Sequence, residues 1–448
     1  MKEETLRKEI FKIVGRILEE RSVDDHFKPG EDRITYAAPF YDHEEIEQMI
    51  NAILNGWFGA GKLTRRFEIE LSKLTGTKIV IMTSSGSSAN LLSVSALLSP
   101  EQKKEVKVNP EDEVLTSALI TPGSFNPILQ NNLVPVLLDV EKETYNINAD
   151  NLKLGLSDAT KAIIIPHTFG NPSEIDSITD FAEEHNLFLI EDACYALGSR
   201  YNGRHVGSFG TFGTFSFSPG SQITTGEGGA VATKDKELSN IVLSLRDWGR
   251  ACTLPICDPL HCPDKGCPKS VSYREDYAHE SLPEDYDKRY MYLTQGYNFE
   301  PTEIQAAMGI AQLKKFSQIT ERRKENFRIL YEEIQNHEES FILPETLPKS
   351  DPCWYAFPLT IRENAKFDLK EIIEWFTQHN IEIRPLFANT AYGQPAYKKS
   401  HYRIAGNLAN SEHAIHTSFS LGIHPGINDE MMKYIISTIR RLINKHKK

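Results

Sequence analysis

The sequence predicts an α/β fold with a mostly parallel central sheet, and two observations support this prediction. Between residues 75 and 235, short apolar runs rich in β-branched residues alternate with helical stretches. Runs that are apolar throughout are typical of parallel strands, because helices cover both faces of such a sheet. In chain order, the runs are KIVIM, DEVLT, VPVLLDV, KAIIIPH, NLFLIED, GTFSF and GAVAT.

The length and composition indicate more than one domain. The chain has 448 residues, of which 40% are hydrophobic and 25% are charged, as in ordinary globular proteins. This is too long for one compact core. We expect a helical arm over residues 1–35, a large domain over 36–320 and a smaller C-terminal α+β domain over 321–448. A long helical stretch from residue 302 is expected to connect the domains, and residues 252–290, rich in Cys, Pro, Asp and Tyr, to form an irregular insertion.

The charge pattern excludes several classes of protein. A net charge of −12 argues against a partner such as duplex nucleic acid. No apolar run approaches the roughly 18 residues of a membrane helix, and the first residues are too charged for a signal peptide. We therefore expect a cytoplasmic protein. The arm has apolar residues at helical spacing and is expected to pack on the body or on a second subunit: Leu6, Ile10, Ile13 and Ile17.

Polar residues follow several of the predicted strands, at the edge where parallel sheets bind ligands. Gly86 and Ser87 open a helix, whose free N–H groups attract a phosphate; a plain Ser-rich helix cap is the alternative. Asp192 ends a strand, where a carboxylate can keep a pyridine nitrogen protonated. His167 follows another strand and points to the same edge, either for substrate contact or as a structural histidine.

The stretch from Thr214 to Thr233, TFSFSPGSQITTGEGGAVAT, predicts a strand, an irregular loop and a second strand. Such a loop places a side chain beside a bound group. Its middle nevertheless holds Ser221 between Gly220 and Gln222, with no Lys, His or Cys.

Taken together, these motifs resemble the DegT-type family of pyridoxal-phosphate sugar aminotransferases and dehydratases. The resemblance includes Glu191-Asp192 and the segment GYN…TEIQAAMGIAQL from Gly296, and it covers the chain from about residue 36 to its end. It implies the PLP-dependent transferase fold type I, like aspartate aminotransferase, and a homodimer with shared active sites.

Within the family, several stretches are similar to the branch of CDP-4-dehydro-6-deoxy-D-glucose 3-dehydratases: SSGSSANLL, NPILQNN, LRDWGR, YDKRYMYLTQGYN and SDPCWYAFPLT. The branch implies pyridoxamine phosphate, a two-iron cluster bound by Cys, and no Schiff-base Lys, whose place falls at Ser221. Serine cannot form an imine, but a cofactor bound as its amine needs none. The resemblance implies that this amine condenses with the sugar's C4 ketone and that the C3 hydroxyl then leaves.

The resemblance also assigns roles to single residues. Ser216 is expected to contact the cofactor phosphate, and Asn298 to reach the phosphate of the neighbouring subunit. Two positions depart from the pattern: Thr121 stands where the family has a stacking aromatic residue, and Ser221 where the branch has a His base. Because a Ser hydroxyl is a poor base, another group is expected to assist. The candidates are Tyr195, His167, a water molecule or the cofactor phosphate.

Five cysteines are candidate metal ligands: Cys194, Cys252, Cys257, Cys262 and Cys267. By resemblance, Cys194, Cys252 and Cys262 match the cluster positions of the branch, and Cys257 or Cys267 replaces the remaining ligand. An iron–sulfur cluster, structural zinc and unligated thiols all remain open. A cluster would imply an NAD(P)H-dependent flavin or iron–sulfur reductase as partner.

The predicted function is therefore a pyridoxamine-phosphate-dependent, iron–sulfur 3-dehydratase. It would remove the C3 hydroxyl of a CDP-4-keto-6-deoxyhexose, in the synthesis of 3,6-dideoxyhexoses for a bacterial O-antigen. Arg250 could meet a nucleotide phosphate, whereas Arg246 is expected to be an exposed surface residue. The alternatives are a nucleotide-sugar aminotransferase and a non-enzymatic relative.

Overall fold

The computed structural model describes residues 2–23, 26–251, 290–386 and 393–447. Its largest sheet has eight strands in the order β1-β9-β8-β5-β4-β2-β3-β14. From β8 to β14 every neighbouring pair is parallel, whereas β9 is antiparallel to both β8 and β1. The predicted mostly parallel sheet is therefore confirmed. The strands are β1 (Ile79–Thr83), β2 (Glu113–Ser117), β3 (Val134–Leu138), β4 (Thr160–Pro166), β5 (Phe188–Asp192), β8 (Phe212–Ser216), β9 (Gly229–Thr233) and β14 (Arg403–Ile404).

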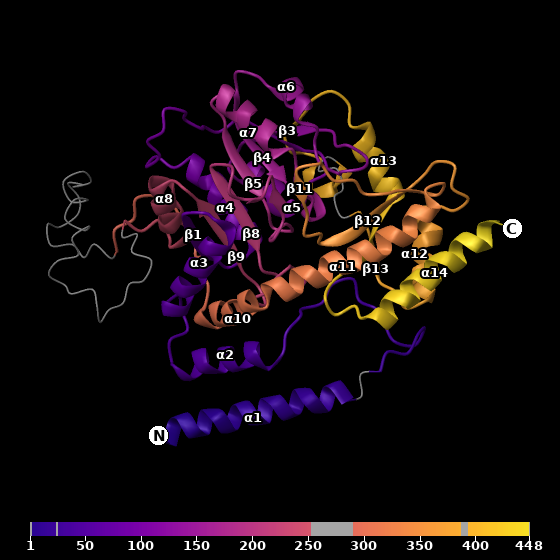
Figure 1. Cartoon of the computed structure of the whole chain (residues 1–448). Helices are drawn as coiled ribbons and strands as arrows, with labels where there is room; N and C mark the ends of the chain where they lie inside the picture. Colours follow the sequence, from indigo (N-terminus) through magenta and orange to yellow (C-terminus); the bar gives the residue numbers. More distant parts are fainter. Residues whose placement is uncertain (1, 24–25, 252–289, 387–392, 448) are drawn as a thin grey trace, which may run out of the picture.

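Helices cover both faces of this sheet (Figure 1), which explains why its strands are apolar throughout. Alternate residues of β4 belong to different cores: Ala162 and Ile164 to one, Ile163 and Ile165 to the other. Residues of α4 and α8 complete the first core, and residues of α3, α7 and α10 complete the second. The helices around the sheet are α3 (Lys62–Thr75), α4 (Gly86–Leu97), α5 (Pro122–Gln130), α6 (Leu152–Gly155), α7 (Ile175–Glu184), α8 (Lys236–Arg246) and α10 (Glu303–Lys314).

The C-terminal part has its own sheet, β10-β12-β15-β13, in which all neighbouring strands are antiparallel. Short strand pairings link this part of the chain to the large domain. Strand β14 adds an edge strand beside β3, and a small sheet, β11-β6-β7, pairs Ser350 with Tyr201. The elements are α11 (Phe316–Ile334), β10 (Phe341–Ile342), β11 (Ser350–Asp351), β12 (Ala356–Ile361), α12 (Leu369–Gln378), β13 (Ile383–Pro385), α13 (Ala409–Thr417), β15 (Ser418–Gly422) and α14 (Asp429–Lys447), with β6 (Arg200–Tyr201) and β7 (Arg204–His205).

The predicted connector is two helices rather than one. Helix α10 ends at Lys314 and α11 begins at Phe316, with Lys315 between them outside the helical range. The Lys315 ammonium lies 2.7 Å from a carboxylate oxygen of Glu45, on the helix that crosses α10. This ion pair fixes the residue between the two helices to the neighbouring helix.

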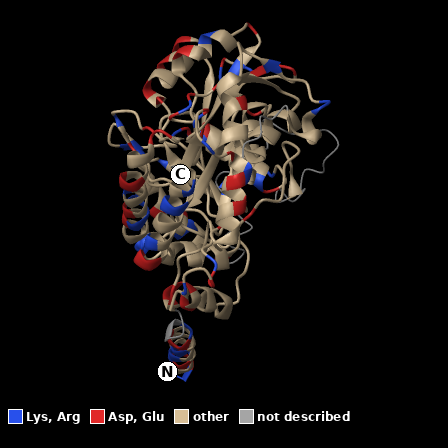
Figure 2. Ribbon diagram, turned by 90° about the vertical axis from the view of Figure 1, so that its right-hand side faces the viewer, with Lys and Arg blue, Asp and Glu red and all other residues tan. Residues whose placement is uncertain are grey.

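The predicted arm contains helix α1 (Lys2–Val23), which projects from the body (Figure 2) and lies along α2 (His43–Leu54) (Figure 1). Arg7 donates to Asn51 Oδ1 of α2 at 3.0 Å. The apolar face of α1 remains exposed at Leu6, Ile10, Ile13 and Ile17. No helix among the described residues is long and apolar enough to cross a membrane.

Candidate functional site

The start of α4 forms an anion cradle at the carboxyl edge of the sheet. Ser85 caps the helix, and its hydroxyl accepts the N–H of Ser88 at 3.0 Å. Among the described residues, the N–H groups of Gly86 and Ser87 have no hydrogen-bond partner. A side chain on Gly86 would collide with Ser216, because its Cβ would lie 2.6 Å from Ser216 Cβ. The absence of a side chain therefore lets the helix start approach the end of β8, and its free N–H groups can bind an anion.

Asp192 lies beside this cradle, at the end of β5. Its Oδ1 accepts the backbone N–H of Cys194 at 3.0 Å, and its Oδ2 accepts a hydrogen bond from the Ser124 hydroxyl. The Cys194 sulfur would lie 3.0 Å from a Cβ on Gly86, so carboxylate and helix start belong to one site. A carboxylate accepts about four hydrogen bonds. Asp192 therefore keeps the capacity to accept another donor.

Thr121 occupies the position before α5, but its hydroxyl does not cap that helix. It lies 3.4 Å from the Ser124 hydroxyl, next to the Asp192 carboxylate. A Cβ on Gly123 would lie 3.0 Å from Ser87 Oγ, so the start of α5 faces the start of α4. The structure thus brings Thr121, Ser87 and Asp192 together at one edge of the sheet.

Ser221 lies in the loop between β8 and β9 and is buried. Its hydroxyl is 2.9 Å from that of Ser218, and its N–H donates to the Ser218 carbonyl at 3.0 Å. Gln222 donates to the carbonyl of Tyr195 at 2.5 Å, which ties the loop to the segment after Asp192. The loop is therefore fixed beside the site without an amine or imidazole in it.

The buried guanidinium of Arg323 stabilises this loop through hydrogen bonds to its backbone. Arg323 of α11 donates to the carbonyls of Gly220 at 3.1 Å and Ser221 at 3.2 Å. It also donates to the Tyr355 carbonyl at 3.0 Å. No described carboxylate pairs with this guanidinium. Three backbone carbonyls therefore stabilise the charge of Arg323 in place of a carboxylate. These hydrogen bonds also join the Ser221 loop to the C-terminal part of the chain.

Tyr195 packs against Tyr355, with ring centroids 4.5 Å apart. Burial raises the pKa of the Tyr195 phenol above its ordinary value, and the nearby Tyr355 adds to this. A phenol with a raised pKa stays neutral at physiological pH, so Tyr195 is not available as a phenolate base. A Cβ on Gly220 would lie 3.0 Å from the Tyr355 hydroxyl, so the tyrosine pair borders the Ser221 loop.

His167 is buried, and both of its ring nitrogens have partners. Its Nε2 lies 3.2 Å from Glu191 Oε2, and its Nδ1 accepts the N–H of Ser173 at 3.1 Å. Burial by itself raises the pKa of Glu191, but His167 and the N–H groups of Gly207 and Gly210 outweigh burial and hold that pKa below its ordinary value. These contacts favour the structural role of His167 that the sequence left open.

The sequence also singled out Asn298, Arg250 and Arg246. Asn298 is exposed, and Phe299 beside it accepts the N–H of Ser84 at 2.9 Å, just before the cradle. Arg250 is half-buried over the Trp248 ring. The expectation for Arg246 was wrong: it is 3% exposed and donates to the Met82 carbonyl at 2.8 Å. A long α8 side chain can reach across β1, which spacing along the helix does not reveal.

Of the candidate metal ligands, Cys194 is described. It is buried, with its sulfur 4.0 Å from both Asn90 Nδ2 and Thr214 Oγ1. Burial raises the pKa of its thiol well above the ordinary value, and nearby Asp192 adds to this. The described ranges contain no group of three or more potential metal-binding side chains. The other candidates lie outside those ranges: Cys252, Cys257, Cys262 and Cys267.

The residues at this edge fit a phosphorylated pyridine cofactor. The free N–H groups of Gly86 and Ser87 and the hydroxyl of Ser216 suit a phosphate. The carboxylate of Asp192 suits a protonated ring nitrogen. The side chain of Thr121, which lies beside Ser124, offers no aromatic face to such a ring.

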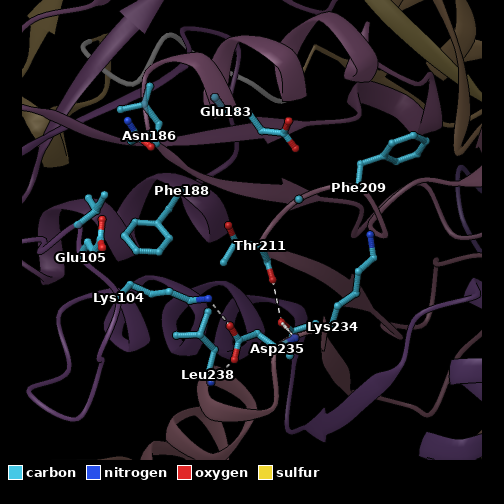
Figure 3. A pocket seen from close by; sticks show the side chains of 15 residues that line it. Lys104, Glu105, Glu183, Asn186, Phe188, Phe209, Thr211, Lys234, Asp235 and Leu238 are labelled. Atoms are coloured by element: carbon cyan, nitrogen blue, oxygen red, sulfur yellow. Dashed lines mark hydrogen bonds and ion pairs between the residues drawn. The ribbon is translucent and has the colours of Figure 1, made fainter.

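A separate cavity of about 570 Å³ lies at the opposite edge of the sheet (Figure 3). It is lined by Phe188, the first residue of β5, and by Thr211, just before β8. Lys104 and Asp235 form an ion pair of 2.6 Å in its wall. Because Asp192 and Ser216 end the same two strands, this cavity is not part of the candidate site.

Sequence reasoning missed several residues of the site. Ser124 and Asn90 contact it from α5 and α4, and Arg323 supports the Ser221 loop. A signal existed for Arg323, because Ile319 and Leu330 place it on the buried stripe of α11. No comparable pattern distinguished Ser124, since its role depends on contact with another element.

Comparison with known proteins gives a family. The model of the DegT/DnrJ/EryC1/StrS aminotransferase family matches residues 40–254 and 273–440. The lipopolysaccharide biosynthesis protein RfbH of Salmonella typhimurium is 39% identical over 432 residues, covering 96% of this chain and 97% of that protein. The dTDP-4-dehydro-2,6-dideoxy-D-glucose 3-dehydratase of Saccharopolyspora spinosa is 39% identical over 419 residues, with coverages of 94% and 88%.

Solved structures show the same fold. The GDP-4-keto-6-deoxy-D-mannose-3-dehydratase of E. coli, with bound hydrated PLP, superposes with a TM-score of 0.79 at 26% identity. The match covers 91% of this chain and 100% of that one. The predicted PLP-dependent transferase fold type I is therefore confirmed.

Proposed function

Because this chain belongs to the DegT/DnrJ/EryC1/StrS aminotransferase family, we propose that it is a nucleotide-sugar 3-dehydratase that uses pyridoxamine phosphate. The observation that carries the proposal is a complete cradle without an anchoring amine. Gly86, Ser216 and Asp192 suit the cofactor, and the loop beside them holds Ser221, where the resemblance places the Lys. An aminotransferase of this family needs that Lys.

When bound, pyridoxamine phosphate supplies an amine for the ketone of the sugar and a ring that withdraws electrons. The residues of this chain hold it and manage protons. Gly86, Ser87 and Ser216 would bind the phosphate, and the Asp192 carboxylate would accept a hydrogen bond from the protonated ring nitrogen. Tyr195, which is neutral near physiological pH, is proposed to donate a hydrogen bond toward the departing C3 hydroxyl.

The substrate is proposed to be a CDP-4-keto-6-deoxyhexose. The named relatives act on dTDP- and GDP-linked sugars, which supports the nucleotide-sugar class. RfbH is a lipopolysaccharide biosynthesis protein, and this supports a role in making O-antigen dideoxysugars. The cytidine base rests on the resemblance of the sequence alone.

An iron–sulfur cluster and a reductase complete the proposal. Cys194, beside Asp192, and the cysteines of the insertion are the proposed ligands. Loss of the C3 hydroxyl leaves a product that needs two electrons to complete deoxygenation. The cluster would pass these electrons from an NAD(P)H-dependent flavin or iron–sulfur reductase.

We also propose a homodimer. Asn298 is exposed beside the cradle, as a residue that serves a neighbouring subunit must be. The exposed apolar face of α1 and the exposed Trp57 and Phe58 are suited to a partner surface. Light scattering on the purified chain tests this, and a monomer at micromolar concentration contradicts it.

The test of the function is anaerobic purification, followed by an absorption spectrum, an iron count and incubation with pyridoxamine phosphate and CDP-4-keto-6-deoxyglucose. We expect a coloured, iron-containing protein that binds the cofactor and consumes the sugar. A colourless, iron-free protein that binds no pyridoxamine phosphate overturns the proposal. Amine transfer to the sugar would indicate an aminotransferase, and cofactor binding without turnover a non-enzymatic relative.

A further inference from the structure

A row of buried side chains leads from β8 to the Asp192 carboxylate. Thr214 Oγ1 lies 2.6 Å from Asn90 Oδ1, and Asn90 Nδ2 lies 3.5 Å from Ser124 Oγ. The Ser124 hydroxyl contacts Asp192 Oδ2. Four elements thus meet at one carboxylate: β8, α4, α5 and β5. The exposed fractions are 0% for Thr214, 3% for Asn90, 1% for Ser124 and 7% for Asp192.

The Asn90 amide fixes the direction of this row. Its oxygen only accepts, so Thr214 donates to it, and its nitrogen only donates, so the Ser124 oxygen accepts from it. Ser124 then turns its own hydrogen to Asp192. Every hydrogen in the row therefore points toward the carboxylate, and hydrogen bonds aligned in this way strengthen one another.

We propose that Ser124, Asn90 and Thr214 are positioning residues that hold the Asp192 carboxylate in one orientation, as the acceptor for the ring nitrogen of the cofactor. The inference rests on the proposed function. The Cys194 N–H, 3.0 Å from Oδ1, holds the other oxygen. Each oxygen thus accepts one hydrogen bond from the protein and keeps capacity to accept another from the ring nitrogen.

The row acts through Ser124 as its last member. Loss of the Ser124 hydroxyl removes a hydrogen bond to a charged group, and we expect S124A to bind pyridoxamine phosphate about tenfold more weakly. T214V keeps the shape of its side chain and removes the first donor, so we expect a smaller loss. The double variant S124A/T214V should bind no more weakly than S124A, because Thr214 acts through the residue already removed.

The test is a calorimetric titration of the full-length purified chain with pyridoxamine phosphate, which measures the affinity for the cofactor. S93A is the matched control, because Ser93 also has a buried hydroxyl but lies on α4 and bonds to the Ala89 carbonyl at 2.9 Å. A second readout is the NMR shift of an isotopically labelled ring nitrogen in the bound cofactor at fixed pH. We expect S124A to move this shift toward that of neutral pyridine, and S124T to restore it.

Binding and nitrogen shifts equal to wild type in S124A and T214V overturn the inference while the proposed function stands. Additive losses in the double variant also overturn it, because the residues then act separately. If S124A does not fold, cofactor binding and the nitrogen shift are compared between wild type, T214V and S124T instead. A wild-type chain that binds neither pyridoxamine phosphate nor pyridoxal phosphate overturns the proposed function, and this inference with it.

Discussion

The hydroxyl groups of Ser218 and Ser221 lie 2.9 Å apart in the loop after β8. The resemblance to the dehydratase branch implies a His base at position 221. The Ser221 hydroxyl is thus paired with another hydroxyl. Neither group takes up a proton near neutral pH, so this pair cannot replace an imidazole as the base. Substitutions at position 221 can therefore test which side chain the reaction needs there.

We expect S221H to raise the dehydration rate by on the order of 10²-fold, because an imidazole restores a general base. Single-turnover kinetics with pyridoxamine phosphate and CDP-4-keto-6-deoxyglucose measure this. S218A is the control, since it disrupts the same hydroxyl pair without supplying a base, and its rate should change less than about threefold. A rate for S221H at or below wild type contradicts the prediction.

We expect S221K to acquire a borohydride-reducible covalent bond to pyridoxal phosphate, because it places an amine in the loop beside the cradle. Mass spectrometry after reduction detects the modified peptide. Wild type and S221R, which adds a cation without a nucleophilic amine, should remain unmodified. Equal modification of wild type would place the reactive lysine elsewhere in the chain.

Arg246 and Glu68 form a buried pair, each 3% exposed, with Nη1 and Oε1 3.7 Å apart. We expect R246M to lower the free energy of unfolding by about 3–5 kcal/mol, because it leaves the Glu68 carboxylate without its buried partner. Urea unfolding measures this, and E68Q/R246M should recover part of the loss.

The control is R66A, because Arg66 pairs with Glu70 at the surface. It should cost less than about 1 kcal/mol. Equal losses for R66A and R246M would mean that burial of the pair does not matter.

His205 predicts an acid-sensitive fold. Its Nε2 accepts the N–H of Gly198 at 2.8 Å, and burial lowers its pKa from 6.5 to about 4. Below pH 6.5, His205 binds a proton in the unfolded chain but stays neutral in the folded chain. The free energy of unfolding therefore falls as the pH falls from 6.5 to about 4. The full loss is about 3 kcal/mol.

Urea unfolding at about pH 7.5 and about pH 4.5 tests this linkage. H205Q should lose less stability between the two conditions than wild type does. H424Q should show the same reduction, because burial also lowers the pKa of His424 to about 4. Identical pH dependence in wild type and both variants contradicts the prediction. At higher pH, both histidines are neutral in the folded and in the unfolded chain. There, the free energy of unfolding should depend on pH in the same way in wild type and in the variants.

The sequence by itself determined the sheet and the edge that carries the site. Apolar runs bounded by polar strand ends predicted the strands that end near Gly86, Asp192 and Ser216, since burial on both faces leaves a direct signature in composition. The motifs also identified the family. The boundaries of the two domains and the roles of the site residues remain predictions.

Tertiary structure decided what the side chains do. His167 faces Glu191, Arg246 is buried and donates to the Met82 carbonyl of β1, and Ser124 of α5 contacts Asp192 of β5. Helical and strand periodicity report which face of an element is buried, but not which residue of another element meets it there. Hydrogen bonds between distant segments depend on that meeting, and for this reason the network behind Asp192 could not be found before the chain was folded.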